Sequence, residues 1–426
     1  MLQRIQPAAR LEGVLRLPGD KSISHRYAML GAIAEGRTRV HNYSTGADCA
    51  STLGCVRALG IGVEREGTEV AIDGGGLDGL KAPAGTLDAG NSGSTIRMLS
   101  GILAAQPFAS RIAGDESLSR RPMGRIIQPL EAMGASITAR DGRLPPLEIH
   151  AARLHAIDYA LPVASAQVKT CVLFAGLYAE GVTVVREPAR TRDHSEIALR
   201  EFGAEVDVRA RMISLVGRPR LRALELTVPG DLSSAAFFLV AALLVPGSHI
   251  VIESVGLNPT RSELLDFLIA MGADLRVRNL ALHAGEPVGD IEVRHSAVRG
   301  GVIEKDLTAA LIDEIPVLAV LGAASEEGLT VRDASELRVK ETDRIATVAE
   351  NLGRMGVTVE VFADGLRVPG RQRFRAAELD SFGDHRIAMA FAVAALAAGG
   401  ESVISGAEAA SVSFPEFFGL VEGLRG

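Results

Sequence analysis

Two related stretches, PGDKSISHRYAMLGAIA (residues 18–34) and PGDLSSAAFFLVAALLV (residues 229–245), give the strongest indication of the fold. Each opens with Pro-Gly-Asp, reaches a Ser within the next few residues, and then continues as a run of small and apolar residues. A helix that is apolar on nearly every side must be buried on every side, so both stretches predict helices packed inside a domain. Because the second stretch begins 211 residues after the first, the chain is predicted to consist of two similar halves.

The same pattern extends to six similar units along the chain. Each unit has a polar start, an apolar helix, a β-branched strand and a second helix that ends at a bulky apolar residue followed by Gly. The units start near Gly19, Asn91, Ser165, Gly230, Asp313 and Asp384. The first five close at Gly60, Gly134, Gly203, Gly272 and Gly356, which gives spacings of 41, 43, 38, 42 and 43 residues. This even spacing predicts a repeat architecture, and the closing glycines predict left-handed helix caps.

The segments that follow the closing glycines predict strands. Gly62–Glu64 and Val357–Glu360 are short, contain β-branched residues and come directly after a helix stop. Helices therefore alternate with strands in every unit, which predicts an α/β protein whose apolar helices lie inside the sheets.

Composition excludes several classes of protein. The 426 residues are 47% hydrophobic and 23% charged, as in an ordinary globular protein. The net charge is −7, aromatic residues make up only 4% and Trp is absent, so a nucleic-acid-binding role is not expected. Any anionic ligand must be held by a local cluster of cations.

The cysteines and apolar runs predict a cytoplasmic protein. Cys49, Cys55 and Cys171 form no CxxC pair, so neither a disulfide framework nor a cysteine zinc site is expected. The longest apolar runs, Ala235–Val245 and Ile387–Ala398, fall short of the ~20 residues that span a bilayer. The first 16 residues lack the pattern of a secretory signal.

A polar cluster at the start of the first buried helix predicts an anion site. Ser22 and Arg26 stand four residues apart on one face of the first turn, beside Lys21. Cations at a helix N-terminus are unfavourable unless an anion lies between them, and the free backbone N–H groups there attract anions. The alternative is a capped helix whose charges are merely solvated.

Two clusters in the second half repeat this theme. Lys340 and Arg344 are predicted to be neighbours on one helix, a like-charge pair that an anion would stabilise, with Glu341 beside them. Asp384-His385-Arg386 directly precedes a buried helix, as the first cluster does. Each could also be a solvated charged surface with Asp384 acting only as a cap.

Three further positions complete the candidate site. Arg121 lies in Arg-Arg-Pro-Met-Gly, where Pro fixes a turn that can direct a guanidinium inward. Ser165 and Gln167 open the third buried helix and can hydrogen-bond a neutral polyol. Asp313 is a carboxylate in apolar surroundings at a unit start, where burial and nearby cations act on it in opposite senses, as for a proton-transfer group.

Together these motifs resemble the 5-enolpyruvylshikimate-3-phosphate synthase (EPSP synthase) family, from Leu17-Pro18-Gly19-Asp20-Lys21-Ser22 to Ser413-Phe414-Pro415-Glu416-Phe417. The resemblance implies an α/β fold of two inside-out domains, each of three βαβαββ units. It places the first domain at residues 1–19 and 229–426 and the second at residues 20–228. It implies a monomeric cytoplasmic transferase without metal or organic cofactor, which acts on small molecules and not on nucleic acid or membranes.

The resemblance also implies the binding residues for the two substrates. Those for shikimate 3-phosphate are Lys21, Ser22, Arg26, Ser165, Gln167, Arg192, Asp313 and Lys340. Those for phosphoenolpyruvate are Lys21, Gly93, Arg121, Gln167, Arg344 and Arg386. Two phosphorylated carboxylic acids explain the number of cations, because arginine forks match carboxylate and phosphate groups.

The implied reaction adds the shikimate 5-hydroxyl to C2 of phosphoenolpyruvate while C3 gains a proton, and then eliminates phosphate. Asp313 is the candidate base and Glu341 the candidate proton donor, with Lys21 assisting and His385 close by. The product leads to chorismate and the aromatic amino acids, and the herbicide glyphosate occupies the phosphoenolpyruvate region in this family.

Departures and alternatives remain. Val412 stands where many family members have Lys, and Glu336 stands where some have Asn. UDP-N-acetylglucosamine enolpyruvyl transferase shares the fold, but the segment from Asp115 to Gly124 lacks the Cys of that family. A non-catalytic anion-binding protein would not need Asp313 and Glu341. Gly93, where tolerant relatives carry Ala, predicts sensitivity to glyphosate, whereas Ser165–Lys169 and Thr191–His194 resemble the tolerant subgroup.

Overall fold

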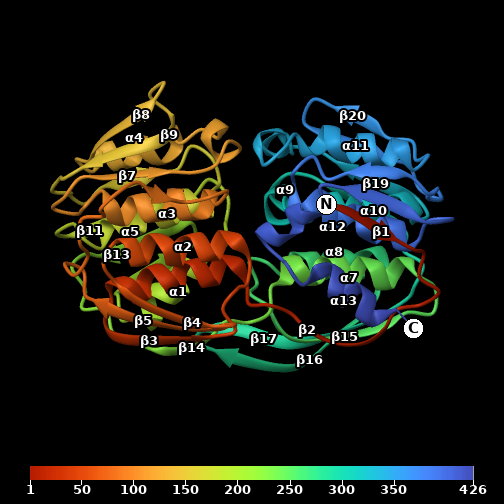
Figure 1. Cartoon of the computed structure of the whole chain (residues 1–426), viewed down its shortest axis with the longest axis horizontal. Coiled ribbons are helices and arrows are strands. Elements are labelled where there is room, and N and C mark those ends of the chain that lie inside the picture. The colour runs from red at the N-terminus through yellow and green to blue at the C-terminus, as the bar shows by residue number, and fades with distance from the viewer. Residues whose placement is uncertain (426) are drawn as a thin grey trace. The chain divides into compact units, whose positions relative to one another are not determined.

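The computed structural model describes residues 1–425, which form two compact units. Unit 1 begins with Met1–Leu17, resumes with Pro229–Leu282 and continues from Pro287 to Arg425. Unit 2 comprises Pro18–Val228 together with the short segment His283–Glu286, which the sequence did not lead us to expect there. Figure 1 shows both units in cartoon form.

Three four-stranded sheets form the framework of unit 2. The first has the order β14 (Glu225–Thr227), β3 (Glu35–His41), β5 (Glu69–Gly75) and β4 (Gly62–Glu66). The second has the order β6 (Leu87–Asp88), β7 (Ser110–Ala113), β9 (Leu144–His150) and β8 (Ser136–Arg140). The third has the order β10 (Asp158–Ala160), β11 (Val182–Arg186), β13 (Met212–Val216) and β12 (Val206–Arg209). In each sheet the first pair of strands is parallel and the others are antiparallel.

The core of unit 2 contains three apolar helices that the sheets surround. They are α1 (Lys21–Ile33), α3 (Gly93–Leu103) and α5 (Ala166–Gly176). Figure 1 shows α1 and α3 between β7 and the strands β3–β5. The helices pack so closely that a Cβ added to Gly101 of α3 would lie 2.2 Å from the carbonyl oxygen of Cys171 in α5. The remaining helices of unit 2 are α2 (Ala47–Ala58), η1 (Leu118–Arg120), α4 (Gly124–Ala132) and α6 (His194–Glu201).

Unit 1 also surrounds apolar helices with three sheets, but one of them has three strands, and the strands β16 and β17 share their turn with the His283–Glu286 segment of unit 2. Its first sheet has the order β16 (Asp274–His283), β17 (Glu286–Arg294), β15 (His249–Gly256) and β2 (Glu12–Arg16). The second has the order β18 (Gly300–Ile303), β19 (Gly328–Val331), β21 (Gly365–Val368) and β20 (Glu360–Phe362). The third has the order β1 (Leu2–Ile5), β23 (Ser402–Ser405) and β22 (Glu378–Asp380). The core helices are α7 (Leu232–Leu244), α10 (Ile315–Ala324) and α12 (His385–Leu396). The others are α8 (Glu263–Met271), α9 (Asp306–Leu311), η2 (Ser335–Val339), α11 (Arg344–Arg354), η3 (Ala407–Val412) and α13 (Phe417–Leu424).

The repeat pattern predicted most of these elements. A core helix begins within three residues of every predicted unit start, and the five closing glycines have φ between 80° and 103°. Gly62–Glu64 lies in β4 as expected, but β20 begins only at Glu360, so the prediction of a strand over Val357–Val359 was wrong. The three cysteines are free and buried, and no helix within residues 1–425 is long and apolar enough to cross a membrane.

Candidate functional site

The predicted anion site at the start of α1 is built around a buried arginine. Asp20 caps the helix by accepting a hydrogen bond from the Ile23 N–H at 3.0 Å. One turn later, Arg26 donates from Nη1 to the Ser22 carbonyl oxygen at 2.8 Å. The alternative of a solvated cation is therefore wrong for Arg26, whose exposure is only 3%.

Two hydroxyl groups from distant segments hold the Arg26 guanidinium. Nε donates to Ser195 Oγ at 2.7 Å, and Nη2 donates to Thr170 Oγ1 at 2.8 Å. Burial lowers the pKa of Arg26 to about 10, against the opposing influence of Glu196 and Asp20. Arg192 also lowers the pKa of Arg26, which places this second predicted cation within electrostatic reach of the first. Lys21 lies on the same turn as Ser22, and its Nζ is 3.0 Å from Asp48 Oδ2.

A second group in unit 2 gathers where α3 and α5 begin. Arg121 is buried and donates from Nη2 to Asn91 Oδ1 at 2.7 Å, two residues before Gly93. Gln167 accepts from Arg97 Nη1 at 2.8 Å. A Cβ built on Gly93 would lie 2.7 Å from Arg97 Nη1 and 3.6 Å from Arg121 Nη1. The predicted residues Gly93, Arg121 and Gln167 are thus brought to one place, and Ser165 caps α5 beside them by accepting from Val168 N.

In unit 1, three cations surround Asp313. Its carboxylate lies 3.5 Å from Lys340 Nζ, 3.6 Å from Arg344 Nη1 and 3.8 Å from Arg386 Nη2. Arg386 also donates from Nη1 to the Asp313 carbonyl oxygen at 2.9 Å. The Asp313 side chain is 16% exposed, so the carboxylate can reach a ligand while the cations hold it in place.

Arg344 is the buried centre of this cluster. It lies 2.6 Å from Glu341 and pairs with both carboxylate oxygens of Asp384. Burial acts to lower the pKa of Arg344, but Asp384, Glu341 and Asp313 outweigh it and hold the pKa above its usual value. Burial likewise acts to raise the pKa of Asp384, and Arg344 outweighs it, with help from His385, so that this pKa is lowered. His385 is buried at the first position of α12.

One detail of the prediction was wrong. Lys340 and Arg344 do not share a helix, because η2 ends at Val339 and α11 begins at Arg344, with Asp343 as its cap. The intervening turn nevertheless brings both cations to Asp313, through tertiary contact and not through helical spacing.

Several residues of these clusters were missed by sequence reasoning. Asp384 was expected only to cap α12, and no role was foreseen for Asp48, Arg97, Thr170 or Ser195. Asp384 adjoins a quoted motif and Ser195 follows one, so both carried a weak signal. Arg97 and Thr170 lie inside apolar helices, and no feature of the sequence indicated a role for them.

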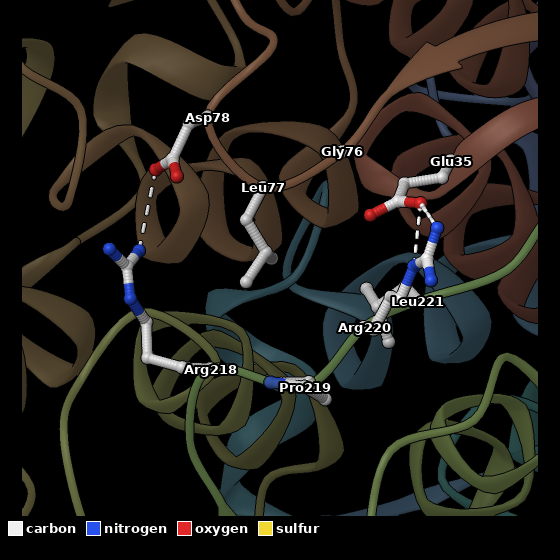
Figure 2. A pocket seen from close by; sticks show the side chains of 8 residues that line it. All are labelled: Glu35, Gly76, Leu77, Asp78, Arg218, Pro219, Arg220 and Leu221. Carbon is white, nitrogen blue, oxygen red and sulfur yellow. Dashed lines mark hydrogen bonds and ion pairs between the residues drawn. The ribbon is translucent and has the colours of Figure 1, made fainter.

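One surface pocket of unit 2 is not part of this site. It has a volume of about 360 Å³ and is lined by the eight residues drawn in Figure 2, none of which was a predicted site residue. Its charged side chains neutralise one another in two pairs, Arg220–Glu35 at 2.7 Å and Arg218–Asp78 at 3.3 Å. Among residues 1–425, no group of three or more His, Cys, Asp or Glu side chains is arranged to hold a metal ion.

Comparison with known proteins gives one consistent result. The family model for EPSP synthase (3-phosphoshikimate 1-carboxyvinyltransferase) matches residues 5–420. A 3-phosphoshikimate 1-carboxyvinyltransferase of Solibacter usitatus is 70% identical over 422 residues, which cover 99% of each chain. One from Koribacter versatilis is 55% identical over 415 residues, which cover 97% of each chain. The solved structure of EPSP synthase from Acinetobacter baumannii superimposes with a TM-score of 0.89 at 44% identity, covering 100% of this chain and 98% of that one.

Proposed function

Because the chain belongs to the EPSP synthase family, we propose that the two clusters of unit 2 and the Asp313 cluster of unit 1 bind its substrates. The protein is an α/β enzyme with 3-phosphoshikimate 1-carboxyvinyltransferase activity in the shikimate pathway. It transfers the enolpyruvyl group of phosphoenolpyruvate to the 5-hydroxyl of shikimate 3-phosphate and releases phosphate.

Eight residues are assigned to shikimate 3-phosphate. In unit 2 these are Lys21, Ser22, Arg26, Ser165, Gln167 and Arg192, and in unit 1 they are Asp313 and Lys340. The buried Arg26, with Arg192 in electrostatic reach, supports the assignment, since a phosphate and a carboxylate need fixed cations. Ser165 and Gln167 add hydroxyl and amide groups suited to the alcohols of the ring.

Phosphoenolpyruvate is assigned to Gly93, Arg121, Gln167, Arg344 and Arg386, with Lys21 shared between the substrates. The proximity of Gly93 to Arg121 supports this, because the absent side chain leaves room for a ligand beside the guanidinium. Arg344 and Arg386 in unit 1 are less than one-tenth exposed, and such rigid guanidinium groups bind carboxylate and phosphate with two hydrogen bonds each.

Asp313 is the central residue of the proposed mechanism. Its carboxylate is the base that takes the proton of the 5-hydroxyl as the oxygen bonds to C2 of phosphoenolpyruvate. Glu341 delivers a proton to C3. In the second step Asp313 passes its first proton to the departing phosphate and takes a proton from the C3 methyl group as phosphate leaves C2, and Glu341 regains a proton from solvent before the next turnover. The close Glu341–Arg344 pair supports this role, because it holds the Glu341 carboxyl group beside an arginine assigned to phosphoenolpyruvate. Lys21 and His385 assist through their charge or hydrogen bonds.

The single observation that supports this best is the position of one carboxylate within 3.5–3.8 Å of three cations. The test is phosphate release measured with shikimate 3-phosphate and phosphoenolpyruvate together, and with each omitted in turn. Release that requires both is expected. Release with UDP-N-acetylglucosamine in place of shikimate 3-phosphate would favour the other enolpyruvyl transferase, and none at all would favour a non-catalytic protein.

We also infer that the enzyme is a monomer of the cytoplasm. The three free, buried cysteines are consistent with a reducing compartment. Light scattering during size-exclusion chromatography tests the monomer, and a mass of twice 44.7 kDa would contradict it.

A further inference from the structure

Unit 2 buries a lysine that no step of the mechanism uses. The side chain of Lys169 in α5 has no exposed surface, and its Nζ lies 2.7 Å from Glu196 Oε1 and 3.1 Å from Glu187 Oε1. The two glutamate side chains are 3% and 4% exposed. Removing three charges from water is costly, and a fold gains little stability from a buried ion pair compared with apolar packing. The presence of this buried Lys169–Glu187–Glu196 triad therefore calls for a role beyond stability.

Two members of the triad are each next in sequence to a residue that holds Arg26. Arg26 belongs to the shikimate 3-phosphate half-site, as we call the unit 2 residues assigned to that substrate (Lys21, Ser22, Arg26, Ser165, Gln167 and Arg192). Lys169 precedes Thr170, and Glu196 follows Ser195, and both hydroxyl groups accept from Arg26. The two neighbours also hydrogen-bond each other at 2.5 Å. Helices α5 and α6 are thus joined by two successive links, an ion pair and a hydroxyl pair, and the second holds the guanidinium.

Glu187, the third member of the triad, is linked to the loop that carries Arg192. Glu187 follows the last residue of β11 and accepts a hydrogen bond from the Thr191 hydroxyl. Thr191 is the residue before Arg192, so Lys169 is connected through Glu187 to the loop between β11 and α6. Helix α5 also carries Gln167. The buried Lys169 is therefore connected to Arg26, to the loop with Arg192 and to Gln167.

We propose that the Lys169–Glu187–Glu196 triad is a positioning group that sets Arg26 and Arg192 for shikimate 3-phosphate. The inference rests on the proposed assignment of that substrate to Arg26 and Arg192. Lys169 and the glutamates touch no substrate. They act by fixing the distance between α5 and α6 and the course of residues 187–193, so that the two guanidinium groups meet the ligand without rearrangement.

The test separates positioning from stability. Thr191→Val and Glu187→Gln release the loop while leaving the Lys169–Glu196 pair in place. Each is expected to raise the KM for shikimate 3-phosphate about tenfold, because a misplacement of about 1 Å can cost about a hundredfold. The KM for phosphoenolpyruvate, measured with the other substrate saturating, should change by less than about twofold. Lys169→Met should have the larger effect, and Lys169→Arg should restore part of it.

Thr183→Val is the matched control, since Thr183 is buried in β11 and its hydroxyl has no hydrogen-bond partner among residues 1–425. It should leave both KM values unchanged. If the folded Thr191 and Glu187 variants retain the wild-type KM for shikimate 3-phosphate, or if both KM values rise equally, the triad has no positioning role. The two mild variants decide this even if Lys169→Met does not fold.

Arg26→Lys, measured in parallel, distinguishes this inference from the proposed site. A raised KM for shikimate 3-phosphate in Arg26→Lys, with no effect of the triad variants, overturns the positioning role alone. An unchanged KM in Arg26→Lys overturns the assignment of the substrate to this half-site, and the inference with it.

Discussion

Asp384 accepts hydrogen bonds from Arg344 with both carboxylate oxygens, Oδ2 at 2.7 Å from Nε and Oδ1 at 3.2 Å from Nη2. The same Asp384 caps α12 by accepting from the Arg386 N–H at 2.8 Å. One buried carboxylate therefore orients one of the proposed phosphoenolpyruvate arginines and fixes the backbone of the other.

The first prediction separates these two tasks. Asp384→Asn keeps a good helix cap but removes the charge that balances Arg344. Breaking a buried pair of this kind costs about 3 kcal/mol of unfolding free energy, and misorientation of Arg344 should raise the KM for phosphoenolpyruvate about thirtyfold. Chemical denaturation and steady-state kinetics measure both.

The control for that variant is Glu350→Gln, which breaks an exposed Arg354–Glu350 pair at 2.5 Å on α11. The unfolding free energy and the KM for phosphoenolpyruvate should then change little, because exposed ion pairs contribute about 0–1 kcal/mol. Equal losses in the two variants would contradict the special role of Asp384.

The second prediction concerns proton transfer. Asp313→Asn keeps a side chain of the same shape that can still hydrogen-bond but cannot accept the proton. We expect kcat to fall by about a hundredfold or more, while the Kd for shikimate 3-phosphate changes by less than about threefold. Calorimetric titration and single-turnover phosphate release give the two numbers. An equal loss of affinity and rate would make Asp313 a binding residue only.

The third prediction concerns glyphosate. A Cβ at position 93 would lie 2.7 Å from Arg97 Nη1, so Gly93→Ala must displace the Arg97 side chain and narrow the space beside Arg121. The methyl group should weaken glyphosate by a larger factor than phosphoenolpyruvate, because the inhibitor is slightly longer. Inhibition constants and KM values for wild type and variant measure this.

Gly124→Ala is the matched control, because it also adds a methyl group at the first residue of a helix of unit 2. There the nearest atom, Arg143 Cβ, is 4.0 Å away. A wild type that is already insensitive to glyphosate, or a Gly93→Ala enzyme that loses both ligands equally, would refute the steric explanation.

The fourth prediction is a pH dependence of stability. Burial, with Lys21 and Arg26 nearby, lowers the pKa of His25 well below its usual value, so the folded protein keeps it neutral. Its contribution to stability is therefore complete above a pH of about 6.5, where the unfolded His is also neutral, and is lost as the pH falls. The loss from this group is at most about 1.4 kcal/mol per pH unit.

His25→Gln should make the unfolding free energy depend less steeply on pH between about 6.5 and 5. His41→Gln is the opposite control, since Glu225 and Glu69 raise the pKa of that surface histidine. The wild-type contribution of His41 is fully present below a pH of about 6.5 and is lost as the pH rises through the raised pKa, so its removal should leave the slope between about 6.5 and 5 nearly unchanged and abolish a loss of stability above about 6.5. If the unfolding free energy of His25→Gln and of wild type changes with pH in the same way, the lowered pKa of His25 is contradicted.

Local chemistry was enough to predict the repeating elements. Helices such as Leu232–Leu244 are apolar on all sides, which leaves burial as their only stable environment. Gly272 ends α8 in the left-handed region at φ 103°, a conformation that the residue type alone makes accessible. These features depend on neighbours in sequence, and so they can be read from it.

Tertiary structure decided which of the charged residues act together. Lys340 and Arg344 were predicted to meet through helical spacing, yet they meet at Asp313 because a turn lies between them. Nothing local indicated that Lys169 would be buried between Glu187 and Glu196, or that Arg344 would pair with Asp384, 40 residues away.

Periodicity, caps and short motifs are local, and so the six repeats, the resemblance to the family and most of the candidate residues could be predicted from neighbouring residues alone. Which carboxylate balances which cation depends on how the chain folds. A charge becomes a buried partner or a ligand-binding group according to the atoms that replace its water, and those atoms come from segments that are distant in the chain.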